Sequence, residues 1–183
     1  LSKSEILNVS KSFKNVQLKK NEYLVDAGAY FDQLVFLKKG ILRSGSNQDQ
    51  DSGVLQSKEF TFENNFLFLN SSLLTSKPFP YSIHALIDSE ILVLTRTELE
   101  GIYENIPGFI AVLRQITQDE MEKQEKLTVL SKIKAPHKRY DYFQRNFALI
   151  AAQLPENQLA SFLHIPASEL NRIRKKISVG STF

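Results

Sequence analysis

The chain has 183 residues, of which 42% are hydrophobic and 23% are charged, proportions ordinary for a globular protein with a sizeable core. It contains no cysteine, which excludes disulfides, thiolate zinc sites, iron–sulfur clusters and cysteine nucleophiles. No run of about eighteen apolar residues is present, and LSKSEILNVS lacks the apolar core of a signal peptide, so we expect a cytoplasmic protein without a membrane partner.

The net charge of +3 is divided unevenly along the chain. Residues 132–177 hold nine Lys and Arg against three acidic residues, a net charge of +6, whereas residues 1–131 carry a net charge of −3. This asymmetry is typical of an acidic sensor or scaffold joined to a module that binds a polyanion. A solvated basic surface is the plainer alternative, and charge alone does not decide between it and nucleic-acid binding.

Residues 16–95 have the pattern of an all-β domain. Short segments rich in β-branched and aromatic residues alternate with breaks at Gly, Asn, Asp or Pro: VQLKKNEYLVDAG, DQLVFLKKGILRSG, GVLQSKEFTF, YSIHALIDS and EILVLT. Strands at this spacing favour a sandwich or barrel over β-α-β units.

The periodicity becomes helical after the last of these segments. TELEGIYENI, residues 97–106, predicts a short helix with Thr97 as its N-cap, and Pro107 interrupts it. Residues 108–133 contain no proline and would extend about 39 Å if fully helical. An apolar stripe predicts that this long helix pairs with its copy in a homodimer. Its members are Phe109, Leu113, Ile116, Leu127 and Leu130.

QLASFLHIPASELNRIRKKI, residues 158–177, predicts two short amphipathic helices joined by a tight turn. Ala160 is small enough for close helix packing, Ile165 is the apolar residue of the turn, and Leu170 and Ile173 face inward, as in a helix-turn-helix. A plain helical hairpin with a solvated basic end remains the alternative. In the first interpretation the outward side chains bind DNA, with Asn and Arg suited to base edges and Lys to phosphates. They are Ala167, Ser168, Asn171, Arg172, Lys175 and Lys176.

In the order and spacing of its segments, nearly the whole chain resembles the Crp/Fnr transcription regulators. Three stretches carry the resemblance. FDQLVFLKKGILRS resembles the strand–glycine–strand segment, and PYSIHALIDSEILVLTRTELEGIY resembles the end of the cyclic-nucleotide-binding-like roll. KRYDYF followed by QLASFLHIPASELNRIRKK resembles the DNA-binding end of a branch of the family with a short or missing wing. The resemblance implies an α+β fold with a jelly-roll-like β-roll over residues 1–107, a long dimerisation helix over 108–133 and an all-α helix-turn-helix domain over 134–183. It also implies a bacterial homodimer that binds DNA, and it leaves open a small-molecule effector of unknown identity.

The residues that hold cyclic nucleotides in this family do not match. The family's Gly-Glu pair aligns with Leu69 and Asn70, and its Arg-Ser/Thr pair aligns with Phe79 and Pro80. A buried phosphate without a cation or a glycine cradle would lose its charge-assisted hydrogen bonds, so we expect no cyclic-nucleotide binding. Aromatic residues near Glu63 indicate an apolar core filling or an apolar ligand. The candidate pocket residues are Phe60, Phe62, Glu63, Phe66, Phe68 and Tyr81.

No pattern indicates catalysis, a metal site or a cofactor. A nucleophile elbow, a P-loop, a dinucleotide fingerprint and an H-x-x-x-H pair are all absent, so we expect no catalytic residue and no enzyme. His84, His137 and His164 lack metal-binding spacing, and His84 is expected to be a half-buried structural residue rather than a haem ligand. Two alternative functions remain: an effector-binding or protein-interaction module whose helix-turn-helix no longer reads DNA, and a cyclic-nucleotide sensor with a rewired pocket.

Overall fold

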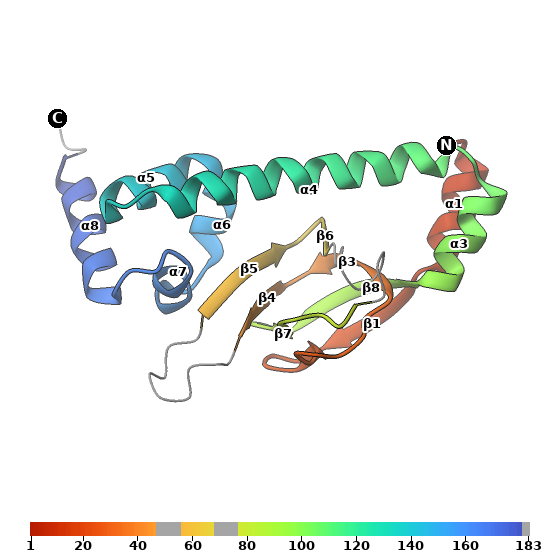
Figure 1. The fold of residues 1–183 in the computed structure, drawn as a ribbon, viewed down its shortest axis with the longest axis horizontal. Helices are drawn as coiled ribbons and strands as arrows, with labels where there is room; N and C mark the ends of the chain where they lie inside the picture. The colour runs from red at the N-terminus through yellow and green to blue at the C-terminus, as the bar shows by residue number, and fades with distance from the viewer. Residues whose placement is uncertain (47–55, 68–76, 181–183) are drawn as a thin grey trace. The chain divides into compact units, whose positions relative to one another are not determined.

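The computed structural model describes residues 1–46, 56–67 and 77–180 (Figure 1). Within these ranges the contacts define two compact units. Residues 1–46, 58–67 and 77–120 form the first unit, and residues 56–57 and 121–180 form the second. Helix α4 (Phe109–Lys132) begins in the first unit and ends in the second.

Two four-stranded sheets make the β-roll of the first unit. One sheet has the order β1-β8-β3-β6 and the other the order β2-β7-β4-β5. The strands are β1 Lys14–Leu18, β2 Tyr23–Val25, β3 Gln33–Lys39, β4 Ile41–Ser46, β5 Gln56–Phe62, β6 Asn65–Leu67, β7 Ser82–Ala85 and β8 Ser89–Thr95.

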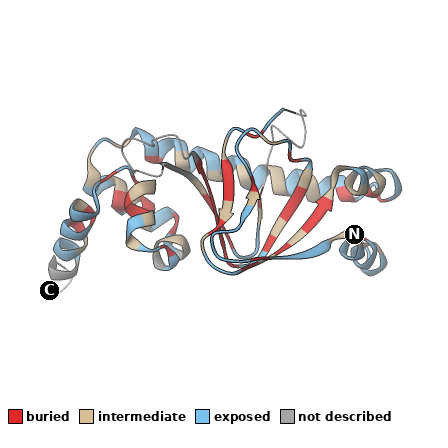
Figure 2. Cartoon of the chain, turned by 90° about the horizontal axis from the view of Figure 1, so that it is seen from below, coloured by how far each residue is buried: buried red, intermediate tan, exposed pale blue. Residues whose placement is uncertain are grey.

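Alternating apolar residues of these strands fill the core of the roll. Val35 and Leu37 in β3 lie opposite Val93 and Ile91 in the antiparallel strand β8, and all four side chains are buried. Ile83 in β7 joins the same cluster from the other sheet. Because strand side chains alternate between faces, this register places one face of each sheet in the shared core (Figure 2).

The helices of the first unit begin with capping boxes. In α1 (Lys3–Ser12) the pair is Ser2 with Glu5, and in α3 (Arg96–Asn105) it is Thr95 with Glu98. The side-chain and backbone hydrogen bonds with Thr95 are the largest cause that lowers the pKa of Glu98 to about 2. The predicted N-cap at Thr97 is therefore wrong, since the helix has already begun at Arg96.

The second unit is helical: α5 (Pro136–Asn146), α6 (Ala148–Gln153), α7 (Glu156–Phe162) and α8 (Ala167–Gly180). Pro136 occupies the first turn of α5, where its missing N–H costs nothing. The ring of Phe143 is fully buried and lies 5.3 Å from the ring of Phe147 and 5.6 Å from that of Phe162, centroid to centroid. The α+β fold class predicted from the sequence is confirmed.

Candidate nucleic-acid interface

Helices α7 and α8 form a helix-turn-helix. Ala160, Ile165, Leu170 and Ile173 are all buried, as the sequence predicted, together with Leu159 and Leu163. Leu159 and Ala160 come from the first helix, Leu170 and Ile173 from the second, and Ile165 from the turn between them.

A Schellman motif closes the turn between these helices. His164 adopts a left-handed conformation with φ of 50°, which is unfavourable for a residue other than glycine. The N–H of Ile165 donates to the carbonyl of Ala160 at 3.1 Å, and the N–H of His164 donates to the carbonyl of Ser161 at 3.1 Å. These bonds, together with the burial of Ile165, hold the backbone in this conformation and fix the angle at which α8 leaves the turn.

The six outward residues predicted to bind DNA are all exposed, and they lie along one face of α8. They occupy positions one and four residues apart, the spacing of a single helical face, while Leu170 and Ile173 between them point into the core. The exposed residues are Ala167, Ser168, Asn171, Arg172, Lys175 and Lys176.

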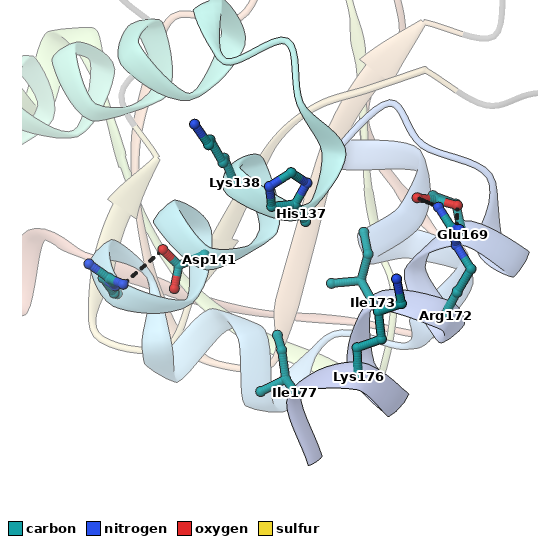
Figure 3. Close-up of a pocket in the computed structure, with 9 residues that line it drawn as sticks. His137, Lys138, Asp141, Glu169, Arg172, Ile173, Lys176 and Ile177 are labelled. Carbon is teal, nitrogen blue, oxygen red and sulfur yellow. Dashed lines mark hydrogen bonds and ion pairs between the residues drawn. The ribbon is translucent and has the colours of Figure 1, made fainter. Parts of the chain in front are cut away.

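Two of these side chains are held by carboxylates. The amide Nδ2 of Asn171 donates to Glu156 Oε1 at 2.6 Å. The guanidinium of Arg172 donates from Nε and Nη2 to the two carboxylate oxygens of Glu169, at 3.0 and 2.8 Å (Figure 3). Their hydrogen bond raises the pKa of Arg172 and lowers that of Glu169. Because Arg172 is exposed, little free energy is needed to exchange this carboxylate for another partner.

A groove of about 580 Å³ runs between α5 and α8 (Figure 3). Ile173 and Ile177 supply its apolar surface, and charged side chains from both helices surround them. Cationic groups outnumber the two carboxylates. The lining residues are His137, Lys138, Asp141, Arg145, Glu169, Arg172, Ile173, Lys176 and Ile177.

Part of the basic excess of the C-terminal region serves the fold. Arg139 Nε donates to the carbonyl of Ile133 at 2.8 Å, and its Nη1 donates to the carbonyl of Leu163 at 2.6 Å. Arg174 Nε donates to the hydroxyl of Tyr140 at 3.1 Å, and its guanidinium lies 5.7 Å from the centroid of that ring. The charge count of the sequence therefore overstated the positive charge available to a polyanion.

The described residues expected to line a pocket in the roll lie in more than one cluster. Phe60 and Phe62 are buried in the first unit, with ring centroids 6.3 Å apart, and Tyr81 packs against the core of the roll. Phe66 packs instead against a second cluster that includes Leu34 and Leu94.

Glu63 has a structural role in the roll. Its side chain is exposed, and its Oε1 accepts a hydrogen bond from the N–H of Gly40 at 3.1 Å, which stabilises the turn between β3 and β4. Phe68, like Leu69 and Asn70, lies outside the described residues.

Phe79 is the residue that the resemblance to the Crp/Fnr regulators aligns with a phosphate-binding arginine, and its ring lies in the core. Phe79 is 9% exposed, belongs to the core of the roll, and meets the ring of Tyr81 edge-on at 6.0 Å. Its backbone is also fixed, because its N–H donates to the carbonyl of Ala29 at 2.8 Å and its carbonyl accepts from Gly28 at 2.7 Å. Phe79 offers no donor for a phosphate.

Sequence reasoning missed a buried charge beside this core. Arg43 in β4 is fully buried, and it lies opposite His84 in β7, which in turn lies opposite Tyr23 in β2. His84 is half-buried, as expected, and burial and then the charge of Arg43 lower its pKa. Burial also lowers the pKa of Arg43. The signal in the sequence was an arginine between the apolar and small residues of ILRSGS.

The expected dimer stripe of α4 is partly used within one chain. Phe109 is 3% exposed and packs in the cluster with Leu34 and Leu94, and Leu130 is 5% exposed. Within one chain these two side chains are already covered, so they have little surface left for contact with a partner chain. Leu113, Ile116 and Leu127 are half-buried, while the more exposed apolar residues of α4 are Ile110, Met121 and Val129.

Two kinds of feature are absent from the residues that the structure describes. In those ranges, no helix combines the length and hydropathy of a membrane span. The same ranges contain no group of three His, Asp or Glu side chains close enough to hold a metal ion.

The geometry can be compared with known proteins. Residues 15–105 match the family model described as the cyclic nucleotide-binding domain. FixK2 from Bradyrhizobium japonicum is similar with a TM-score of 0.75 and 16% identity, over 92% of this chain and 85% of that one. A CooA mutant from Carboxydothermus hydrogenoformans has a TM-score of 0.75 and 14% identity, over 95% of this chain and 83% of that one. A structure described as a putative transcriptional regulator of the Crp/Fnr family from Eubacterium rectale has a TM-score of 0.69 and 17% identity, over 98% of this chain and 85% of that one.

A comparison with curated protein sequences found no match. The roll and the helix-turn-helix define the architecture: a β-roll similar to the cyclic nucleotide-binding domain, followed by a long helix and a helical domain. Residues 15–105 therefore resemble the cyclic nucleotide-binding domain, and the chain as a whole has the same fold as these three solved structures.

Proposed function

We propose that this protein is a DNA-binding transcription regulator of the Crp/Fnr type and not an enzyme. The observation that carries the proposal is the outward face of α8, where six polar, cationic or small side chains are exposed along one side of a helix anchored by Leu170 and Ile173. A helix presented in this way fits the major groove, and Asn171 and Arg172 are of the types that bond adenine and guanine. A regulator of this kind reads the chromosome, which places its action in the cytoplasm.

The test separates base reading from phosphate contact. Operator fragments are first selected from genomic DNA, and binding is then measured on the selected and on a scrambled sequence. Arg172→Ala is expected to cost about 1–3 kcal/mol on the selected site and to relax preference at one base pair. Replacing Lys175 and Lys176 by Ala should weaken binding to both sequences alike and flatten its salt dependence.

Each outcome of this experiment assigns a role. Equal loss on both sequences after Arg172→Ala would make that residue a phosphate contact. Absence of DNA binding by the unaltered chain at low salt would favour the alternative of an interaction or effector-binding module whose helix-turn-helix does not read DNA.

The proposal includes a homodimer that pairs through α4. In a two-fold dimer the two recognition helices would bind two half-sites whose centres lie about 34 Å apart, which is one turn of DNA. Because Phe109 and Leu130 are buried within one chain, we expect Ile116 and Leu127 to make the main contacts between the two copies of α4. Leu113 is also half-buried, but it packs partly against the core cluster of its own chain.

We further propose that the roll does not bind cyclic nucleotides, because Phe79 fills the core at the position of the phosphate-binding arginine. The family match of residues 15–105 favours the alternative, a nucleotide sensor with a rewired pocket. Calorimetric titration with cyclic AMP and cyclic GMP decides between them. No heat of binding is expected, and a dissociation constant of about micromolar or tighter would refute the proposal.

A further inference from the structure

The carboxylate of Glu156 lies where it can control a base-reading side chain. Glu156 is the first residue of α7, whereas Asn171 lies in the second turn of α8, and the turn between the helices brings them together. The contact from Asn171 Nδ2 to Glu156 Oε1 is 2.6 Å, a short hydrogen bond to an ionised acceptor, and bonds to ionised groups are stronger than neutral ones. The other oxygen, Oε2, lies 3.8 Å from Arg174 Nη1, so Glu156 is itself held from a second side.

The chemistry of this contact fixes which way the amide faces. A carboxylate has acceptors only, so it accepts from the NH₂ end of the amide and repels the carbonyl end. Asn171 donates one of its two Nδ2 hydrogens to Glu156. The second hydrogen and Oδ1 remain, and this donor–acceptor pair is what the major-groove edge of adenine requires, with N7 as acceptor and the N6 amino group as donor.

We infer that Glu156, a residue of the first helix, sets the base preference of α8 by fixing the orientation of the Asn171 amide. This inference rests on the proposed function. Glu156 is a positioning residue, since it acts through Asn171 and its carboxylate has no hydrogen to donate to a base. A free asparagine amide would rotate and present two donors to a guanine edge as readily as it presents the donor–acceptor pair to adenine.

The experiment uses the full chain and the selected operator, with each base pair of one half-site varied in turn. Glu156→Gln keeps the length of the side chain but lets it either donate or accept, so both orientations of Asn171 become favourable. Discrimination at the base pair that Asn171 reads is expected to fall about three- to tenfold. Asn171→Ala in the same assay identifies that base pair.

The matched control is Glu125→Gln. It makes the same chemical change and removes one negative charge from the same unit, at an exposed residue of α4 that does not line the groove between α5 and α8. Any purely electrostatic effect should raise the affinity of both variants for all sequences alike. Only Glu156→Gln should change the preference between bases. Thermal midpoints of both variants show that the fold is retained.

The double variant Glu156→Gln/Asn171→Ala tests whether Glu156 acts through Asn171. If it does, the double variant loses no more discrimination than Asn171→Ala alone. Additive losses, or unchanged discrimination in Glu156→Gln, overturn the inference and leave the proposed function intact. If Asn171→Ala changes nothing while Arg172→Ala relaxes one base pair, the inference again fails alone. If the unaltered chain does not bind DNA, both fail.

Discussion

Replacing Arg139 by Met should strongly destabilise the helical unit, because Arg139 links the ends of two of its helices. Arg139 bonds the carbonyl of Ile133, which follows the last turn of α4, and the carbonyl of Leu163, which ends α7. It therefore satisfies carbonyl groups at two helix C-termini, where a positive charge is favourable. Methionine retains most of the apolar stem and removes only the donors.

The size of the effect follows from these two bonds. A hydrogen bond to a charged group contributes about 1.5–3 kcal/mol, and the partial exposure of Arg139 lets water replace some of this, so we expect a loss of about 2–3 kcal/mol. Urea unfolding followed by circular dichroism measures it. Lys138→Met is the control, since Lys138 is the exposed neighbour on α5 and should change stability by less than about 0.5 kcal/mol. Equal shifts in the two variants would refute the reasoning.

Three further predictions test the assembly, the pH response and one turn. Ile116→Asp should convert the proposed dimer to monomer in analytical ultracentrifugation, whereas Met121→Asp, about 140° away around the helix, should not; the reverse result would move the interface to the other face of α4. The pKa of His84 is lowered in the fold, so the unfolded chain binds a proton first and stability is lost as the pH falls below 6.5. His84→Gln should therefore show a smaller drop in thermal midpoint between about pH 7.5 and about pH 5.5, and an equal drop would contradict this. Gly40→Ala should cost more than about 1 kcal/mol, because Gly40 has φ of 112° and a Cβ would lie 2.8 Å from Ser89 Cα; an unchanged thermal midpoint would show that the turn relaxes.

Local sequence signals predicted much of the fold. Residues 108–133 were predicted as one helix, and α4 spans Phe109–Lys132, because Pro107 and Pro136 mark breaks on either side of a continuous helical pattern. The N-cap of α3 shows the limit of such signals. Both Thr95 with Glu98 and Thr97 with Glu100 have the spacing of a capping box, and only the end of strand β8 selects the first pair.

The sequence predicts which side of α8 is exposed, but it does not predict which side chains of the candidate interface contact one another. Helical periodicity identified the exposed side of α8 because every side chain needed lies within three turns. The bond between Glu156 and Asn171 spans 15 positions, and that between Arg139 and Leu163 spans 24. The first contact depends on the angle of the turn at His164, and the second depends on how α5 packs against α7; neither follows from the spacing of residues in the sequence.

The last turns of α4 have a practical consequence for preparing the C-terminal part alone. Leu130 is buried, and the carbonyl of Ile133 accepts from Arg139, so the end of the long helix folds as part of the unit that begins at Met121. A fragment that starts at Pro136 would lose Leu130 and would leave Arg139 with only one of its two carbonyl partners. A fragment that starts at Met121 keeps both contacts, and it is the one we would choose for nuclear magnetic resonance of the helix-turn-helix.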